Sequence, residues 1–265
     1  MDLQKATNKL VTQAEKAIRH QYKIALDETR KKLALIYEKY SIDGKLSYAD
    51  LVKYNRLTSL EKEIVDVFND SQAGVISSLK KLPADVIKEA YSITAGELSD
   101  KVNLGLIPRK AIESAISNPL DLIAHNSLSQ DMRTRIRREV VQGAIQGKGY
   151  DKVASAIKQA YGVTASRAMT IARTEGQRAM NEGHREAYSK AVEKGIDVRL
   201  FWDAYIDSRT RDSHALMNGV EAEMHDGELM FFYSPLGIWV TGPQDPQLPA
   251  EDSINCRCRV RMELA

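Results

Sequence analysis

The spacing of apolar residues changes once along this chain, and the change divides it into a helical part and a part with strands. Up to about Gly195, apolar residues such as Leu3 and Ala6 recur at steps of three and four, which places them along one side of a helix. From Val198 onward they alternate with polar residues, which is the spacing of a half-buried strand. The sequence therefore predicts the α+β class, with a long all-helical amino-terminal region followed by a small α+β carboxy-terminal domain.

Capping and turn residues indicate where the expected elements begin and end. Ser47 resembles a helix N-cap, Thr164 is expected to cap the last long helix, and the prolines and glycines are expected to interrupt helices. The helices predicted in this way cover 2–40, 48 to about 70 with another beyond it, short pieces within 82–118, a hairpin of 131–146 and 151–160, and 164–195. The predicted strands cover 198–203, 229–233, 238–240 and 257–262.

Composition and charge exclude several classes of protein. The chain has 265 residues, of which 28% are charged, and its apolar runs end well before the roughly 18 residues that a bilayer crossing needs. The start, MDLQKATNKL, lacks the apolar core of a signal peptide. We therefore expect a soluble protein that is made in a cytoplasm and has no membrane partner. The 38 basic and 36 acidic residues nearly balance, but a division after Ala165 separates a segment of net charge +6 (26 basic, 20 acidic) from one of −4 (12 basic, 16 acidic). Even +6 is far below the charge of a dedicated nucleic-acid binder.

Polar and aromatic residues of the carboxy-terminal part form an ordered series of motifs. Its members are Arg173, Glu175, Trp202, Asp207, Arg209, Arg211, His214, Gly219, Asn255, Cys256 and Cys258. In this order, the series resembles the phage Mu F-like head morphogenesis family, the minor head proteins of tailed phages, over about residues 144–262. The resemblance implies a helical portal- or capsid-docking region over 1–128 and a Mu F-like minor head domain over 129–265.

The same resemblance implies a structural and assembly protein, not an enzyme. Such a protein is part of the virion, is present in the host cytoplasm during assembly, and binds at or near the portal vertex. It assists head morphogenesis and genome packaging or ejection. Its implied partners are the portal protein and the major capsid or scaffold protein. One alternative is a DNA-binding protein without sequence preference that is ejected with the genome, and another is an ADP-ribosyltransferase-like or zinc-dependent enzyme.

The two cysteines raise the question of a metal. Cys256 and Cys258 are one residue apart, too close for an ordinary disulfide, and they suggest a reducing compartment and shared metal ligation. Many members of the resembled family have CxxC at the positions matching Arg211 and His214, which with the CxC ending would make a four-thiolate zinc site. Arginine cannot ligate a metal, so this chain keeps His214, Cys256 and Cys258 as candidate ligands.

Two interpretations of this partial ligand set remain open. Zinc would need a fourth ligand, for example His225 or Asp207. Alternatively, Arg211 replaces the metal by pairing with a carboxylate such as Asp207 or Asp252, while the cysteines become small buried apolar residues. We expect the second arrangement, and therefore no cofactor.

Arg173 and Glu175 invite a catalytic interpretation, because an arginine and a glutamate near a nucleotide pocket occur in ADP-ribosyl transfer. Side chains so close in sequence on a helix point in different directions and do not converge on one ligand. We therefore expect them to hold the 207–214 loop in place. An enzyme would have to use Glu175, His214 and the cysteines, and the sequence offers no convincing nucleophile beside them.

A basic run lies on the predicted helix before Gly147. Arg133, Arg137 and Arg138 share one side of this helix and are candidate contacts for the phosphates of double-stranded DNA, whereas Arg135 points away. A solvated helix face is the commoner explanation of such a run. Any DNA binding through it would be sensitive to salt and indifferent to sequence.

Overall fold

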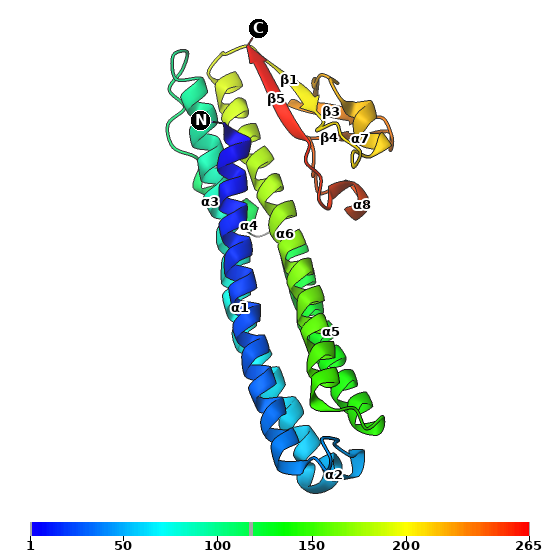
Figure 1. The fold of residues 1–265 in the computed structure, drawn as a ribbon. Coiled ribbons are helices and arrows are strands. Elements are labelled where there is room, and N and C mark those ends of the chain that lie inside the picture. Colours follow the sequence, from blue (N-terminus) through cyan, green and yellow to red (C-terminus); the bar gives the residue numbers. More distant parts are fainter. Residues whose placement is uncertain (1, 117–118, 265) are drawn as a thin grey trace. The chain divides into compact units, whose positions relative to one another are not determined.

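The computed structural model describes residues 2–116 and 119–264, with the side chains of 115, 119–129 and 133 excepted. Its helices are α1 Leu3–Tyr40, α2 Tyr48–Val52, the 3₁₀ helix η1 Lys53–Asn55, α3 Arg56–Glu97, α4 Arg109–Ile116, α5 Pro119–Ile145, α6 Tyr150–Glu193, α7 Asp212–Met217 and α8 Ala250–Ser253. Its strands are β1 Val198–Asp203, β2 Glu223–His225, β3 Glu228–Tyr233, β4 Ile238–Val240 and β5 Arg259–Leu264. The predicted α+β class is confirmed (Figure 1).

The chain forms two compact units, each assembled from separate stretches of sequence. Unit 1 consists of Met1–Gln13, Lys80–Asn118 and Thr170–Ala265, and unit 2 consists of Ala14–Leu79 and Pro119–Met169. Helices α1, α3 and α6 therefore each supply residues to both units. The predicted division between 128 and 129 falls inside α5 and stays a prediction.

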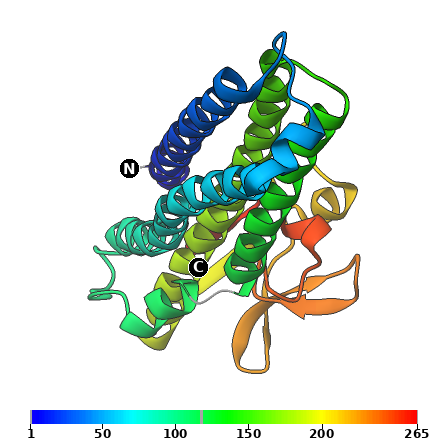
Figure 2. The same ribbon diagram turned by 90° about the horizontal axis from the view of Figure 1, so that it is seen from below.

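Unit 2 is a set of helical segments that lie side by side (Figure 2) and are joined by an aromatic core. Tyr22 of α1, Phe68 of α3 and Tyr161 of α6 form this core, with the Phe68 ring centroid 6.1 Å from that of Tyr22 and 6.0 Å from that of Tyr161. The Tyr161 hydroxyl lies 2.9 Å from Thr29 Oγ1. Aromatic rings bury large apolar areas, and here the polar end of Tyr161 also has a partner.

The predicted cap at Ser47 is confirmed, but the helix that it starts is shorter than expected. Ser47 Oγ accepts a hydrogen bond from the Asp50 backbone N–H at 3.0 Å, and α2 then ends at Val52. Tyr54 and Asn55 have φ of 56° and 57°, left-handed values that interrupt the helix. The sequence predicted one helix from 48 to about 70 and a break near residue 70. That prediction is wrong, because α3 continues through residue 70 to Glu97, and the residues that follow residue 70 are buried.

Pro83 does not end a helix, contrary to the prediction from sequence. It lies inside α3 and is buried, between Leu82 and the buried pair Val86 and Ile87. Proline removes one backbone hydrogen bond from a helix interior. Burial of the neighbouring apolar side chains in unit 1 offsets that loss, so α3 continues to Glu97.

The helical hairpin is confirmed, although both of its arms are longer than predicted. Helix α5 begins at Pro119 instead of Asp131, and α6 runs without a break from Tyr150 through Thr164 to Glu193. The prediction that Thr164 is a cap is wrong. Its hydroxyl donates to the Ala160 carbonyl at 3.0 Å and lies 3.4 Å from the thioether sulfur Sδ of Met132, so it is satisfied inside a helix.

The strands of unit 1 form two antiparallel sheets. In one sheet β1 pairs with β5, with Trp202 opposite Val260, and in the other the order is β2-β3-β4. Strand β2 was not predicted, and β5 begins two residues later than expected. Trp202 is fully buried between these elements, with its ring centroid 5.6 Å from that of Phe231 and 5.8 Å from that of Tyr233. No helix within 2–116 and 119–264 has both the length and the apolarity to span a membrane.

Candidate functional site

The predicted motif residues come together in unit 1, where the loop after β1 meets the segment before β5. In the first loop, Asp207 Oδ1 accepts from the Arg209 backbone N–H at 2.8 Å, and Thr210 Oγ1 accepts from the Asp207 N–H at 2.8 Å. Such side-chain to backbone bonds are the usual reason that Asp and Thr favour tight turns. They place the Asp207 carboxylate toward the segment that precedes β5.

Arg257 and Asp207 join these two segments. Arg257 Nη1 donates to Asp207 Oδ2 and Nη2 donates to Oδ1, both at 2.7 Å. This bidentate pair, together with the Arg209 backbone N–H, holds the pKa of Asp207 well below its usual range. Arg257 was not among the predicted site residues, although its position between the two cysteines was a signal that could have found it.

His214, Cys256 and Cys258 form a buried cluster in which one imidazole nitrogen faces both sulfurs. His214 Nδ1 lies 3.2 Å from Cys258 Sγ and 3.5 Å from Cys256 Sγ. The other imidazole nitrogen, Nε2, lies 3.6 Å from Asp252 Oδ1. The hydrogen bond with Cys256 lowers the pKa of Cys258, and the hydrogen bond with His214 adds to this effect.

This cluster fits part of a zinc site, but not all of it. Its three ligand atoms lie within 4.8 Å of one another. Asp252 lies beside the other imidazole nitrogen of His214, where a carboxylate orients the ring of a metal-bound histidine. A structural zinc site needs four ligands, and within the described chain the group contains three. The residues would therefore hold a metal only with a ligand from outside this set.

Neither predicted source of a fourth ligand joins the cluster. Asp207 is held by Arg257, as described above, and His225 stacks on Trp239 with ring centroids 4.4 Å apart and planes at 11°. The prediction of His225 or Asp207 as a ligand is therefore wrong. Each of these side chains is positioned by a partner on a different part of the domain.

The predicted ion pair of Arg211 is also wrong. Arg211 Nη2 donates to the Ile254 backbone carbonyl at 2.7 Å, and neither Asp207 nor Asp252 is its partner. Asp252 instead accepts from Ser213 Oγ at 3.0 Å. The hydrogen-bond acceptor of Arg211 is therefore a neutral group, and Arg211 places a positive charge near Cys256.

Arg173 and Glu175 diverge on α6, as their spacing predicts, but only one of them approaches the 207–214 loop. Glu175 is buried and accepts from Arg178 Nε at 2.9 Å, so its expected contact with that loop is wrong. Arg173 lines a cavity together with Arg209 and Arg211. The arginine and the glutamate therefore do not form a shared catalytic pair.

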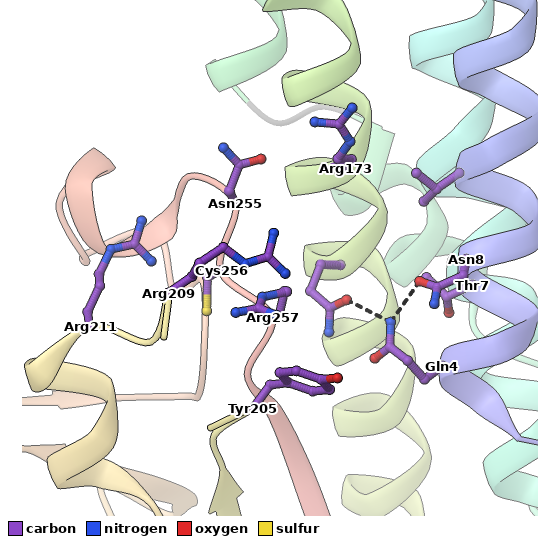
Figure 3. A pocket seen from close by; sticks show the side chains of 12 residues that line it. Gln4, Thr7, Asn8, Arg173, Tyr205, Arg209, Arg211, Asn255, Cys256 and Arg257 are labelled. Carbon is purple, nitrogen blue, oxygen red and sulfur yellow. Dashed lines mark hydrogen bonds between the residues drawn. The ribbon is translucent and has the colours of Figure 1, made fainter. Parts of the chain in front are cut away.

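Figure 3 shows this cavity, which has a volume of about 670 Å³ and is lined by residues of α1, α6 and the two loops. The lining residues are Gln4, Thr7, Asn8, Val11, Arg173, Gln177, Tyr205, Arg209, Arg211, Asn255, Cys256 and Arg257. Four of these described lining residues are arginines. We call this space the arginine cavity.

Two further motif residues shape the backbone around the site. Gly219 has a φ of 81°, in the left-handed region that favours glycine, and its N–H donates to the Trp202 carbonyl at 2.8 Å. The Asn255 N–H donates to Thr174 Oγ1 at 3.1 Å, which ties the segment before β5 to α6. Trp202 is fully buried in the core of the same domain. Trp202, Gly219 and Asn255 therefore have structural roles.

Three amide side chains, two on α6 and one in the loop after β4, hold the Cys256–Cys258 segment. They were not identified from the sequence. Gln177 Nε2 and Asn181 Nδ2 both donate to the Cys258 carbonyl, at 3.3 Å and 3.2 Å. Gln244 Nε2 donates to the Cys256 carbonyl at 3.0 Å. Isolated amides carry no recognisable motif, so only the fold reveals this role.

The basic run on α5 is in contact with acidic residues. Arg137 Nε lies 3.4 Å from Glu61 Oε1, and Arg138 donates to Glu139 Oε1. The side chain of Arg133 lies outside those that the structure describes. These ion pairs reduce the positive charge of the face, and DNA contact through it stays a prediction.

Comparison with known proteins gives both a family match and several relatives. Residues 134–261 match the family described as "Phage Mu protein F like protein". The minor head protein GP7 of Bacillus phage SPP1 is 29% identical over 97% of this chain and 84% of its own length. No solved structure matches the chain significantly.

Two other relatives are longer proteins. The NAD(+)--arginine ADP-ribosyltransferase EFV of Enterococcus faecalis is 25% identical over 89% of this chain, and an uncharacterized protein of Haemophilus influenzae is 23% identical over 86%. This chain spans 48% and 42% of their respective lengths. Residues 134–261 are thus similar to the phage Mu F-like family, as the order of motifs from Arg173 to Cys258 predicts.

Proposed function

We propose that this protein is a minor head protein of a tailed phage, a structural component of the virion that binds at or near the portal vertex. There it assists head morphogenesis and the packaging or ejection of the genome. The observation that carries this proposal is the similarity to GP7 of phage SPP1, which extends over 97% of this chain. The similarity therefore includes the helices before residue 134 as well as the Mu F-like segment.

The arrangement of the motif residues supports a structural role over an enzymatic one. Glu175 is buried against Arg178, and His214 faces two sulfurs, whereas the arginine cavity is lined by neither residue. A transferase or hydrolase would need its acid, base and substrate pocket to meet. The activity named for the Enterococcus relative belongs to a protein of which this chain covers 48%, so we do not extend it here.

Exposed apolar side chains in unit 2 support docking of the helical region on a partner. They lie in the segment from Ile42 to Tyr54, where Ile42 is 73% exposed and Tyr54 is 86% exposed. Val52 and Tyr48 of the same segment are also exposed. Large apolar groups that gather in one exposed segment are typical of a protein interface. We assign the portal protein as the partner of this segment, with the major capsid or scaffold protein as a further contact.

Co-purification with the portal protein of the same phage tests the proposal. We expect the tagged full-length chain to retain the portal protein at micromolar concentrations, and the double variant Ile42→Ser, Tyr54→Ser to retain much less. Leu106→Ser is a matched control, because Leu106 is 91% exposed but lies outside this segment. Failure of the unaltered chain to retain the portal protein would contradict the proposed function, and equal loss in both variants would contradict the assigned surface.

A further inference from the structure

The β2-β3-β4 sheet exposes an aromatic ring on the face that is turned away from the core. In β3, Phe231 and Tyr233 are fully buried, whereas Phe232 between them is 45% exposed. Successive side chains of a strand point to opposite faces, so Phe232 lies on the outward face of the sheet. A sheet with one solvated face normally carries polar residues there. The outward face is therefore apolar where a polar side chain is expected.

Apolar side chains of all three strands share this outward face. Trp239 of β4 is opposite Phe232 in the register, with ring centroids 5.4 Å apart, and Met230 precedes Phe232 by two residues on β3. His225 of β2 stacks on Trp239. All four side chains are at least partly exposed. We call His225, Met230, Phe232 and Trp239 together the aromatic face.

The segment that contains this sheet is acidic. Residues 212–256 include eight aspartates and glutamates but neither lysine nor arginine. The register pairs Glu223 with Met230 and Glu228 with His225, which places both carboxylates beside the aromatic face. Both glutamates are exposed.

One guanidinium from α6 approaches this acidic surface. Arg185 Nη1 lies 3.9 Å from Glu228 Oε2, but Arg185 Nη2 also lies 2.7 Å from Glu182 Oε1. The single positive charge of Arg185 is therefore shared between two carboxylates. Glu223 and Glu228 thus give the surroundings of the aromatic face a negative charge.

An aromatic surface flanked by carboxylates suits a cationic side chain. The faces of tryptophan and phenylalanine rings attract guanidinium and ammonium groups, and tryptophan attracts them most strongly. Carboxylates beside the rings pair with the same cations and repel anionic partners such as nucleic acids. Exposed apolar groups that gather on one surface are typical of a protein interface. We propose that the aromatic face binds a segment of another protein in which arginine or lysine stands among apolar side chains.

This surface is distinct from the one assigned to the portal protein. The segment from Ile42 to Tyr54 belongs to unit 2, whereas the aromatic face belongs to unit 1. The inference does not rest on the proposed function, and the two assignments can fail independently.

Nuclear magnetic resonance of the full-length protein tests the proposal without a phage partner. The chain has two tryptophans and hence two indole N–H signals, which the variant Trp239→Phe distinguishes. The probe is a short synthetic peptide in which arginine alternates with leucine. We expect this peptide to shift the Trp239 signal saturably and to leave the signal of the buried Trp202 in place. Added salt should weaken the binding, because it screens exposed charges.

Two variants with matched controls locate the binding surface. Phe232→Ser removes the exposed ring and should weaken peptide binding about tenfold, and Glu223→Gln removes one charge and should weaken it about threefold. Leu216→Ser is the apolar control, because Leu216 is 69% exposed on α7 and lies outside the sheet. Glu193→Gln is the charge control, because Glu193 is exposed at the end of α6. Both controls should bind like the unaltered protein, and thermal unfolding establishes that each variant is folded.

Several outcomes would overturn the proposal. They are the absence of a saturable shift of the Trp239 signal at millimolar peptide, equal binding of a peptide with glutamate in place of arginine, and equal loss in the variants and their controls. A shift of the Trp239 signal with protein concentration alone would show that a second copy of this chain covers the aromatic face. That result would also contradict the proposed partner.

Discussion

Arg257 Nη1 and Nη2 each donate to a different oxygen of Asp207, both at 2.7 Å, so the residue between the two cysteines fastens the loop after β1. The sequence suggested that Arg173 and Glu175 of α6 would do this. The fastening comes from the segment next to β5 instead. A planar guanidinium matches a carboxylate with two parallel bonds, which the single ammonium of lysine cannot do.

Acid should weaken this pair. The folded-state pKa of Asp207 lies below its ordinary value of 3.8, so its contribution to stability is present above about pH 4 and is lost as the pH falls further. We expect Arg257→Gln to lower the unfolding temperature at pH 6 and to differ less from the unaltered protein at pH 3. Thermal unfolding across this range measures the difference, and a difference that grows toward pH 3 would contradict the assignment.

The histidine–cysteine cluster should be stable without zinc. We expect elemental analysis after dialysis to find less than about 0.1 equivalent of zinc per chain, since the described group has three of the four ligands that a structural site needs. Cys256→Ser and Cys258→Ser should each cost about 1–2 kcal/mol, and Arg211→Ala about 1 kcal/mol for its bond to a carbonyl. Zinc near one equivalent, or unfolding by a chelator, would show that the cluster holds the metal.

His184 should make the protein less stable in mild acid. Burial, aided by the charge of Arg259, lowers its pKa from 6.5 to about 4, so between these values the unfolded chain binds a proton that the folded protein excludes. Stability should therefore fall by about 3 kcal/mol as the pH drops from 6.5 to 4. Denaturant unfolding of His184→Asn should have a shallower dependence, and an unchanged dependence would assign the effect to other groups.

Two glycines of α6 should respond to alanine in opposite directions. A Cβ at Gly183 would lie 2.6 Å from the Ile87 carbonyl oxygen and 2.7 Å from Ala90 Cβ, so Gly183→Ala should destabilise unit 1 by about 2 kcal/mol. At Gly162 a Cβ meets nothing within 4 Å, and Gly162→Ala should stabilise by about 0.5–1 kcal/mol. Similar effects at the two positions would contradict the close helix approach at Gly183.

Local periodicity was sufficient to predict the type of the long helices and of β1, although it missed the short strand β2, and burial decided where the helices end. Alternation identified β1, and the spacing of apolar residues identified α1, because both patterns describe one continuous face. Pro83 and Thr164 were assigned as breaks because each disfavours a helix interior in isolation. Packing within each unit outweighed these local costs, and no local pattern records that packing.

The members of the site could be predicted where their role follows from residue type. Their partners could not be predicted where they depend on the direction in which a side chain points. His214 and the two cysteines were expected together and lie together. The partner of Arg211 was expected to be a carboxylate and is a backbone carbonyl, because which acceptor lies within reach is set by the path of the 254–257 segment. The arginine cavity likewise arises from side chains that are distant in sequence.

The stacking of His225 on Trp239, with ring centroids 4.4 Å apart, provides the protein with two optically distinct tryptophans. Trp202 is fully buried and should emit at short wavelength, whereas Trp239 is partly exposed and should emit at longer wavelength. Intrinsic fluorescence therefore reports separately on the core around β1 and on the β2-β3-β4 sheet. Exposure of Trp202 would shift the short-wavelength emission to longer wavelength, while loosening of the β2-β3-β4 sheet alone would leave that emission in place.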